Sequence, residues 1–132
     1  MTDLERRVLV IAQQENPNRV DLWHKLIEKV LDENGFGTDF SDPQTLPERL
    51  RSFTYSAVIV DLSMVDDPYG LIRKARQQSR DLTILAARWS FGSQDIRDTF
   101  VAGATDVFRK DLEEYKLLDE LKQTILRPPV NS

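Results

Sequence analysis

The sequence lacks cysteine altogether, and its 132 residues include only one histidine and five glycines. Without cysteine, a disulfide framework, a thiolate metal site and a thiol nucleophile are all excluded. No apolar run approaches the roughly 20 residues that span a bilayer. The charged stretch at residues 1–7 also has no apolar segment of the kind found in signal peptides. We therefore expect a soluble, cytoplasmic protein with no membrane partner.

An excess of basic charge is missing too, because 18 basic and 22 acidic residues give a formal net charge of −4. Phosphate contacts need clustered Lys and Arg, so this balance argues against nucleic acid as a partner. The length fits one domain with its own core, which we assign to residues 1–126. Residues 127–132 are typical of a flexible tail or linker, either a free end or the cut edge of a longer chain.

Glycine is absent from residues 13–18, the polar segment that follows the first apolar run. The dinucleotide fingerprint, the P-loop and a flavodoxin-type phosphate cradle need backbone amides close to phosphate, so they are excluded. Phosphatases of the haloacid dehalogenase type need a second carboxylate two residues after the nucleophilic aspartate, but Ser63 stands there relative to Asp61. His24 has no partner at metal-ligand spacing, and we expect it to lie on the surface or half-buried. The sequence therefore gives little support for an enzymatic function.

Four short apolar runs are present, and such runs are typical of strands buried on both faces of a parallel sheet. They cover residues 8–11, 58–60, 82–87 and 105–108, and residues 36–40 are a candidate edge strand. Segments with apolar residues at three- and four-residue spacing separate these runs. This alternation predicts a doubly wound α/β fold, in which helices cover both faces of a five-stranded parallel sheet as a three-layer αβα sandwich.

We expect five helices, each with an apolar stripe that faces the sheet. The expected inward residues are, in chain order, Val20, Trp23, Ile27, Val30, Leu31, Leu50, Phe53, Leu71, Ile72, Ala75, Ile96, Phe100, Leu118, Leu121 and Ile125. The expected helix starts are Pro47 in the first turn of the second helix, then Asp67, Ser93 and Asp111 as caps of the later three.

Asp61 ends the central apolar run. In open parallel sheets, ligands and chemistry lie at the carboxyl ends of the strands, so Asp61 is placed where a functional residue is expected. The alternative is that Asp61 only starts a turn, as aspartate often does after a strand.

Two segments carry a resemblance to a known family. Asp61-Leu-Ser-Met-Val-Asp-Asp-Pro-Tyr-Gly70 resembles the phosphoacceptor segment of the response-regulator receiver family, the CheY-like domains. Ala102-Gly-Ala-Thr-Asp-Val-Phe-Arg-Lys110 is similar to the lead-in to that family's fifth strand and invariant lysine. The resemblance covers nearly the whole chain and implies the strand order 2-1-3-4-5. It also implies that Asp61 is the candidate phosphoacceptor and Lys110 the candidate phosphate-binding or ion-pairing lysine. The chemistry agrees, because a carboxylate nucleophile needs its developing charge neutralised by a nearby cation.

The chain departs from the family's pattern at several positions. The acidic pair that holds Mg²⁺ in the family is replaced by Ala12 and Gln13, and the hydroxyl residue that ends the fourth strand is replaced by Ala87. Val107 stands in place of the aromatic switch residue. The proline after the lysine is Asp111, and a cis bond before a non-proline residue costs about 2.5–4 kcal/mol, so we expect the bond before Asp111 to be trans.

These departures change the expected function. Mg²⁺ prefers carboxylate and phosphate oxygens, and Asp61 is the one motif carboxylate left unless Glu15 or Asp66 leans toward it. We therefore expect no cofactor, with Mg²⁺ only in a working phosphoacceptor, and a stable ion pair between Asp61 and Lys110. The replaced positions bind the metal, contact the phosphate and pass on the switch in the family, which are consecutive steps of its phosphorylation mechanism. This pattern favours an atypical receiver, or pseudo-receiver, of two-component phosphorelay signalling. It would retain at most slow autophosphorylation and autodephosphorylation at Asp61.

Such a domain is expected to act by protein–protein interaction, with a histidine kinase or a downstream output protein as partner and a homodimer as a further option. Arg88, Trp89 and Phe91 are candidate partner contacts, since Trp and Arg are favoured interface anchors. The alternative for Trp89 is that it folds over the site.

Two other functions stay open, a working phosphoacceptor with non-standard metal ligands and a small-molecule sensor that uses the room left by Ala12 and Ala87.

Overall fold

The computed structural model describes residues 6–13 and 22–126, which form five strands and five helices in alternation. The strands are β1 (Arg7–Ile11), β2 (Gly37–Ser41), β3 (Ala57–Asp61), β4 (Ile84–Arg88) and β5 (Asp106–Arg109). They make one parallel sheet in the order β2-β1-β3-β4-β5. The predicted doubly wound fold and its strand order are confirmed.

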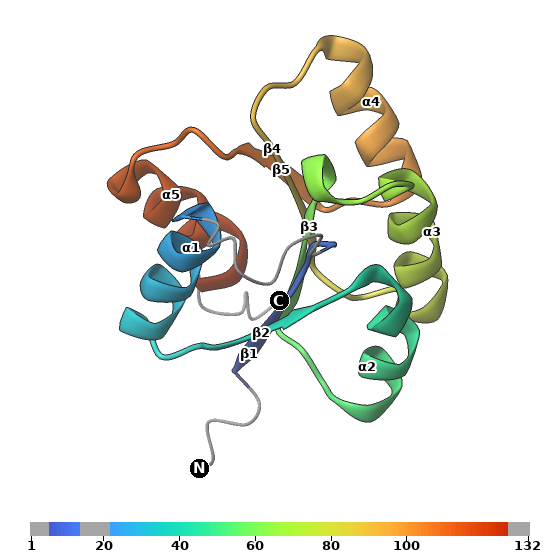
Figure 1. Cartoon of the computed structure of the whole chain (residues 1–132), viewed down its shortest axis with the longest axis horizontal. Helices are drawn as coiled ribbons and strands as arrows, with labels where there is room; N and C mark the ends of the chain where they lie inside the picture. Colours follow the sequence, from blue (N-terminus) through green and yellow to red (C-terminus); the bar gives the residue numbers. More distant parts are fainter. Residues whose placement is uncertain (1–5, 14–21, 127–132) are drawn as a thin grey trace, which may run out of the picture.

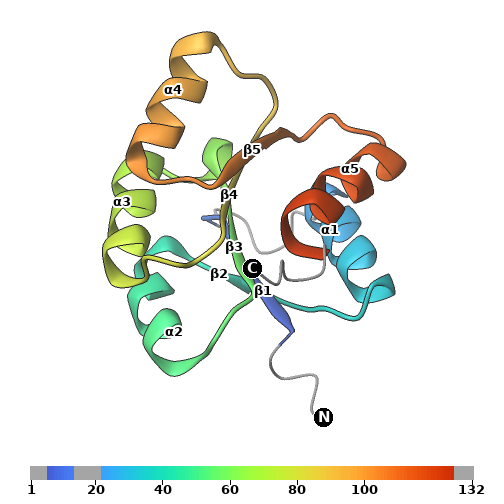
Figure 2. The same ribbon diagram turned by 180° about the vertical axis from the view of Figure 1, so that it is seen from behind.

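The helices are α1 (Leu22–Glu33), α2 (Leu46–Ser52), α3 (Pro68–Gln78), α4 (Ser93–Ala102) and α5 (Glu114–Leu121). Short 3-10 turns at Pro43–Thr45 and Leu62–Met64 precede α2 and α3, and a π-helical turn at Lys122–Leu126 continues α5. Helices α1 and α5 cover one face of the sheet, and α2, α3 and α4 cover the other (Figures 1 and 2). None of the helices in the described part of the chain is long and apolar enough to cross a membrane.

Each face of the sheet has its own hydrophobic core, because successive side chains of a strand point to opposite faces. In β1, Leu9 and Ile11 enter the core beneath α2 and α3, whereas Val8 and Val10 enter the core beneath α1 and α5. All five residues of β3 are buried. The central strand therefore ends in the interior, and this places its last residue, Asp61, under the helices rather than in solvent.

The apolar stripes of α1 and α3 face inward as predicted, but three residues expected inside lie at the surface. Ile96 and Phe100 of α4 are 37% and 43% exposed, and Phe53 after α2 is 51% exposed. Helix α4 instead buries Thr99 and Ala102. The hydroxyl of Thr99 donates to the Asp95 carbonyl at 2.6 Å, so this polar side chain can be buried with its hydrogen bond made.

The helix starts agree with the prediction only in part. Asp67 caps α3 as predicted, and its side chain accepts a hydrogen bond from the Gly70 amide at 3.1 Å. The prediction for Ser93 is wrong, because Gly92 precedes the first turn of α4. Helix α5 begins at Glu114, not at Asp111. The expected inward residue Val20 and the predicted tail at 127–132 lie outside the described residues.

Candidate functional site

Asp61 and Lys110 meet at the carboxyl edge of the sheet. Asp61 is the last residue of β3 and pairs in register with Ala87 of β4. Lys110 follows β5, and its backbone N–H donates to the Arg88 carbonyl at 2.8 Å, which continues the β4–β5 ladder by one residue. The ladder therefore places the lysine beside the end of β4, from which its side chain reaches Asp61. The two candidate site residues are brought together as predicted.

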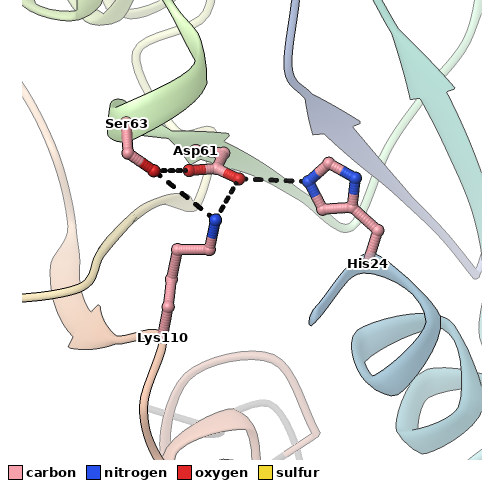
Figure 3. Close-up of polar contacts among 4 residues, drawn as sticks. All are labelled: His24, Asp61, Ser63 and Lys110. Carbon is pink, nitrogen blue, oxygen red and sulfur yellow. Dashed lines mark hydrogen bonds and ion pairs between the residues drawn. The ribbon is translucent and has the colours of Figure 1, made fainter. Parts of the chain in front are cut away.

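Four side chains form a closed polar cluster (Figure 3). The Nζ of Lys110 lies 2.7 Å from Oδ2 of Asp61 and 3.4 Å from Oγ of Ser63. The Ser63 hydroxyl donates to Oδ1 of Asp61 at 2.7 Å, and Nε2 of His24 lies 3.0 Å from Oδ2. An ionised carboxylate only accepts hydrogen bonds, so Nε2 is the nitrogen that carries the proton. Both oxygens of Asp61 are thus engaged.

The Asp61–Lys110 ion pair is withdrawn from water. Asp61 is fully buried, and the side chain of Lys110 is 1% exposed. Burial raises the pKa of the Asp61 carboxyl and is the largest single influence, but hydrogen bonds from its three partners lower it more. The pKa of Asp61 therefore lies below its usual value, and the carboxylate is held in its charged form.

His24 is the site residue that the sequence analysis missed. It was expected at the surface or half-buried, yet it is 8% exposed and bonded to Asp61. The centroid of its ring lies 5.5 Å from that of Trp23 and 5.5 Å from that of Phe40. The signal was present in the sequence, because His24 stands three and seven residues before the buried Ile27 and Leu31 and so belongs to the inward stripe of α1. A buried histidine needs a polar partner, and Asp61 supplies it.

Ser63 entered the sequence analysis only because it stands where a phosphatase of the haloacid dehalogenase type has its second carboxylate. It lies in the 3-10 turn after β3 and is exposed, although its hydroxyl points inward to Asp61 and Lys110. The serine therefore forms the solvent side of a cluster whose charged members are buried.

The positions that depart from the family's pattern lie around this cluster. Ala12 is 4% exposed, and the backbone N–H of Gln13 donates to the Met64 carbonyl at 2.7 Å. Ala87 is fully buried in the core beneath α1 and α5, and Val107 is half-buried against the opposite core. The peptide bond before Asp111 is trans, as predicted.

The family that the chain resembles holds a divalent cation beside its phosphoacceptor, and the residues of this cluster do not fit one. Mg²⁺ needs several oxygen ligands, usually including one or two carboxylates. Asp61 is the one carboxylate of the cluster, and an ammonium and an imidazole already bond to its Oδ2. No group of three or more histidine, cysteine, aspartate or glutamate side chains suited to a metal occurs within residues 6–13 and 22–126.

The loop after β4 lies over the cluster. The Nζ of Lys110 is 5.0 Å from the centroid of the Trp89 ring, yet Trp89 remains 53% exposed. The indole therefore lies against the lysine of the cluster and is half exposed, and the role of Trp89 as a partner contact stays a prediction. Arg88 forms an ion pair with Asp95 at 3.0 Å, and Phe91 is half-buried against the core beneath α3.

Comparison with solved structures identifies the fold. A response regulator from Thermotoga maritima matches with a TM-score of 0.78 and 22% identity, over 93% of this chain and 99% of that one. The chemotaxis protein CheY4 of Vibrio cholerae matches with a TM-score of 0.75 and 16% identity, over 89% of this chain and 97% of that one. A beryllofluoride-activated NtrC4 receiver domain dimer matches with a TM-score of 0.76 and 18% identity, over 92% and 97%. The chain has the receiver-domain fold of two-component response regulators.

At the level of sequence alone, neither a protein-family model nor a curated protein matches the chain. The comparisons therefore show the fold, and the function rests on the chemistry of the site.

Proposed function

We propose that this chain is a receiver-like signalling domain of a two-component phosphorelay that no longer switches by phosphorylation and acts by binding protein partners. The observation that carries the proposal is the closed state of Asp61. Its carboxylate is fully buried, and both of its oxygens accept hydrogen bonds from neighbouring side chains. The expected partner is a histidine kinase or a downstream output protein.

A closed carboxylate is a poor phosphoacceptor for two reasons. An attacking oxygen must reach the phosphorus atom of the donor, and here each oxygen faces a hydrogen-bond donor of the protein. Phosphoryl transfer also depends on cations that neutralise the spread-out charge of the transition state, usually a metal ion together with a lysine. Lys110 is the one such group in the cluster, and it is already paired with Asp61.

The residues that would pass on a phosphorylation signal support the same proposal. In the family that the chain resembles, a hydroxyl residue follows the phosphate and an aromatic residue follows the hydroxyl. Ala87 has no donor to offer a phosphate, and Val107 has no ring to turn inward. The metal-binding positions and the relay positions therefore both depart from the family's pattern.

The test is an amide NMR titration with Mg²⁺ and the phosphoryl mimic beryllofluoride. We expect the spectrum to stay essentially unchanged, because the mimic would have to displace Lys110 and His24 from Asp61. The scale of this penalty is given by the loss of one partner of a buried ion pair, which costs about 3–5 kcal/mol. Saturable shifts confined to residues around Asp61 and Lys110, and absent in Asp61→Asn, would refute the proposal.

One observation favours a second candidate, a working phosphoacceptor with non-standard metal ligands. Asp61 and Lys110 lie at the positions that the family uses, and their side chains contact each other at 2.7 Å. This candidate requires the cluster to open when a phosphoryl donor arrives. Acid-labile incorporation of phosphate that Asp61→Asn abolishes would establish it in place of the first proposal.

A further inference from the structure

The Lys110 ammonium contacts two aromatic rings as well as Asp61. Its Nζ lies 5.0 Å from the ring centroid of Trp23 and 5.0 Å from that of Trp89. Trp23 belongs to the core beneath α1 and is 5% exposed, whereas Trp89 is 53% exposed. A single cation therefore links the interior of the domain to a half-exposed side chain on its surface. A desolvated ammonium attracts an aromatic face more strongly than a hydrated one.

The backbone of the loop that carries Trp89 is held by other groups. The Arg88 carbonyl accepts a hydrogen bond from the Lys110 backbone at 2.8 Å, and the Arg88 guanidinium pairs with Asp95 at 3.0 Å. The Gly92 amide donates to the Asp95 carboxylate at 3.0 Å. None of these bonds uses the side chain of Lys110. The path of the loop and the orientation of the indole therefore depend on different groups.

We propose that Lys110 is a positioning residue for Trp89, so that the buried charge of Asp61 sets the shape of the surface that meets the protein partner. The inference rests on the proposed function, which assigns Trp89 to that surface. Asp61 acts through Lys110. When the carboxylate is removed, the ammonium loses its buried counter-charge, turns toward water and releases the indole. No phosphate is needed for this coupling.

The consequence for binding is specific. Trp89 presents one part of its ring to the partner while another part rests on the ammonium. A partner that accepts an aromatic side chain in this orientation meets an indole that is already ordered, which lowers the entropy lost on binding. Loss of Lys110 or Asp61 should therefore weaken the partner complex even though neither residue touches the partner.

The experiment uses the two tryptophans as reporters. The full chain is labelled with 5-fluorotryptophan, and Trp89→Phe identifies the fluorine resonance of residue 89. We expect Lys110→Met to move the Trp89 resonance toward the position of free fluoroindole. In a Trp23→Phe background, acrylamide quenching of Trp89 should rise by about twofold. Asp61→Asn should produce the same changes, and Lys110→Arg, which keeps a cation, should largely restore the wild-type values.

Lys116→Met is the matched control, because the Nζ of Lys116 lies 5.9 Å from the Tyr115 ring centroid on the exposed side of α5, and its loss should leave Trp89 unchanged. If Lys110→Met does not fold, the double variant Asp61→Asn/Lys110→Met removes both buried charges and should show the same released Trp89. An unchanged Trp89 resonance and quenching constant in either folded variant would overturn the inference and leave the proposed function standing. Uptake of beryllofluoride at Asp61 would instead overturn the proposed function, whatever Trp89 does.

Discussion

At the scale of single residues, Asp61 is the group on which the candidate site depends. It is a buried anion whose charge is balanced by Lys110 at 2.7 Å and shared with His24 and Ser63. Removing one partner of a buried ion pair leaves the other without its counter-charge, and this costs more than the pair itself contributes. The stability of the domain is therefore sensitive to the chemistry of one carboxyl group.

Asp61→Asn should lower the free energy of unfolding by about 3–5 kcal/mol, because the amide has nearly the same shape but removes the buried counter-charge of the Lys110 ammonium. Urea denaturation followed by far-UV circular dichroism measures the loss. Asp66→Asn changes an exposed carboxylate in the following loop and should alter stability by about 0.5 kcal/mol or less. Equal effects of the two substitutions would show that Asp61 is not buried in an ion pair.

The same carboxylate should make the domain sensitive to acid. Its pKa is lowered in the folded state, so its contribution to stability is complete above the unfolded value of about 3.9 and is lost as the pH falls through the folded pKa. Unfolding free energies measured between pH 7 and pH 2 should therefore decline below about pH 4. The decline should be shallower in Asp61→Asn. It should not vanish, because the hydrogen bond from Arg7 lowers the pKa of Asp39 in the same way.

At the scale of elements, α4 differs most from what the sequence predicts. Periodicity correctly identifies α4 as a helix but assigns Ile96 and Phe100 to its inner face, where the structure has Thr99 and Ala102. An apolar stripe indicates that a helix forms. The rotation of the helix about its own axis is set by the neighbours that it packs against. Small residues allow α4 to lie close to α3 and β5, and the Thr99 hydroxyl satisfies its own hydrogen bond to Asp95.

This orientation of α4 can be tested by truncating side chains. Phe100→Ala should cost about 1 kcal/mol or less, since Phe100 is already 43% exposed. Leu117→Ala in α5 should cost about 2–5 kcal/mol, because Leu117 is fully buried and leaves a cavity. Thermal and urea unfolding of both variants give the comparison. A larger loss for Phe100→Ala would place that ring in the core and restore the interpretation from periodicity.

The helix starts show the limit of local sequence signals. Asp67 followed by Pro68 predicts the start of α3 correctly, because the cap and the proline act on the same turn. Ser93 is a good capping residue, but the chain starts α4 one residue earlier, and the Gly92 amide uses the Asp95 carboxylate. The sequence is compatible with a cap at Ser93 and with a cap at Gly92, and the path of the preceding loop decides between the two.

At the scale of the whole molecule, the two cores share the strands of one sheet. Residues of β1, β3 and β4 contribute to the cores on both faces, so loss of either layer of helices exposes one face of strands on which the other core also depends. We expect a single cooperative unfolding transition. Tryptophan fluorescence, which reports on the site, and far-UV circular dichroism, which reports on all helices, should have the same midpoint in urea. Separate midpoints would show that the two layers unfold independently.

The parallel sheet also explains which part of the site was predictable. Carboxyl ends of neighbouring parallel strands share one edge, so residues that follow the third and fifth strands are expected near each other, as Asp61 and Lys110 are. His24 reaches the same edge from α1, and its position depends on where that helix begins and how it is rotated. Those two properties are set by how α1 packs against Phe40 and the sheet, which no short motif encodes.

The contact between Lys110 and Trp89 has a thermodynamic counterpart, because linkage is reciprocal. If the Asp61 carboxylate favours the indole orientation that a partner binds, then the partner must in turn favour the ionised carboxylate. Binding at the surface would lower the proton affinity of a group that water does not reach, and the complex would release protons as it forms in acid. The affinity for such a partner therefore declines with falling pH, even when no titrating group lies in the interface.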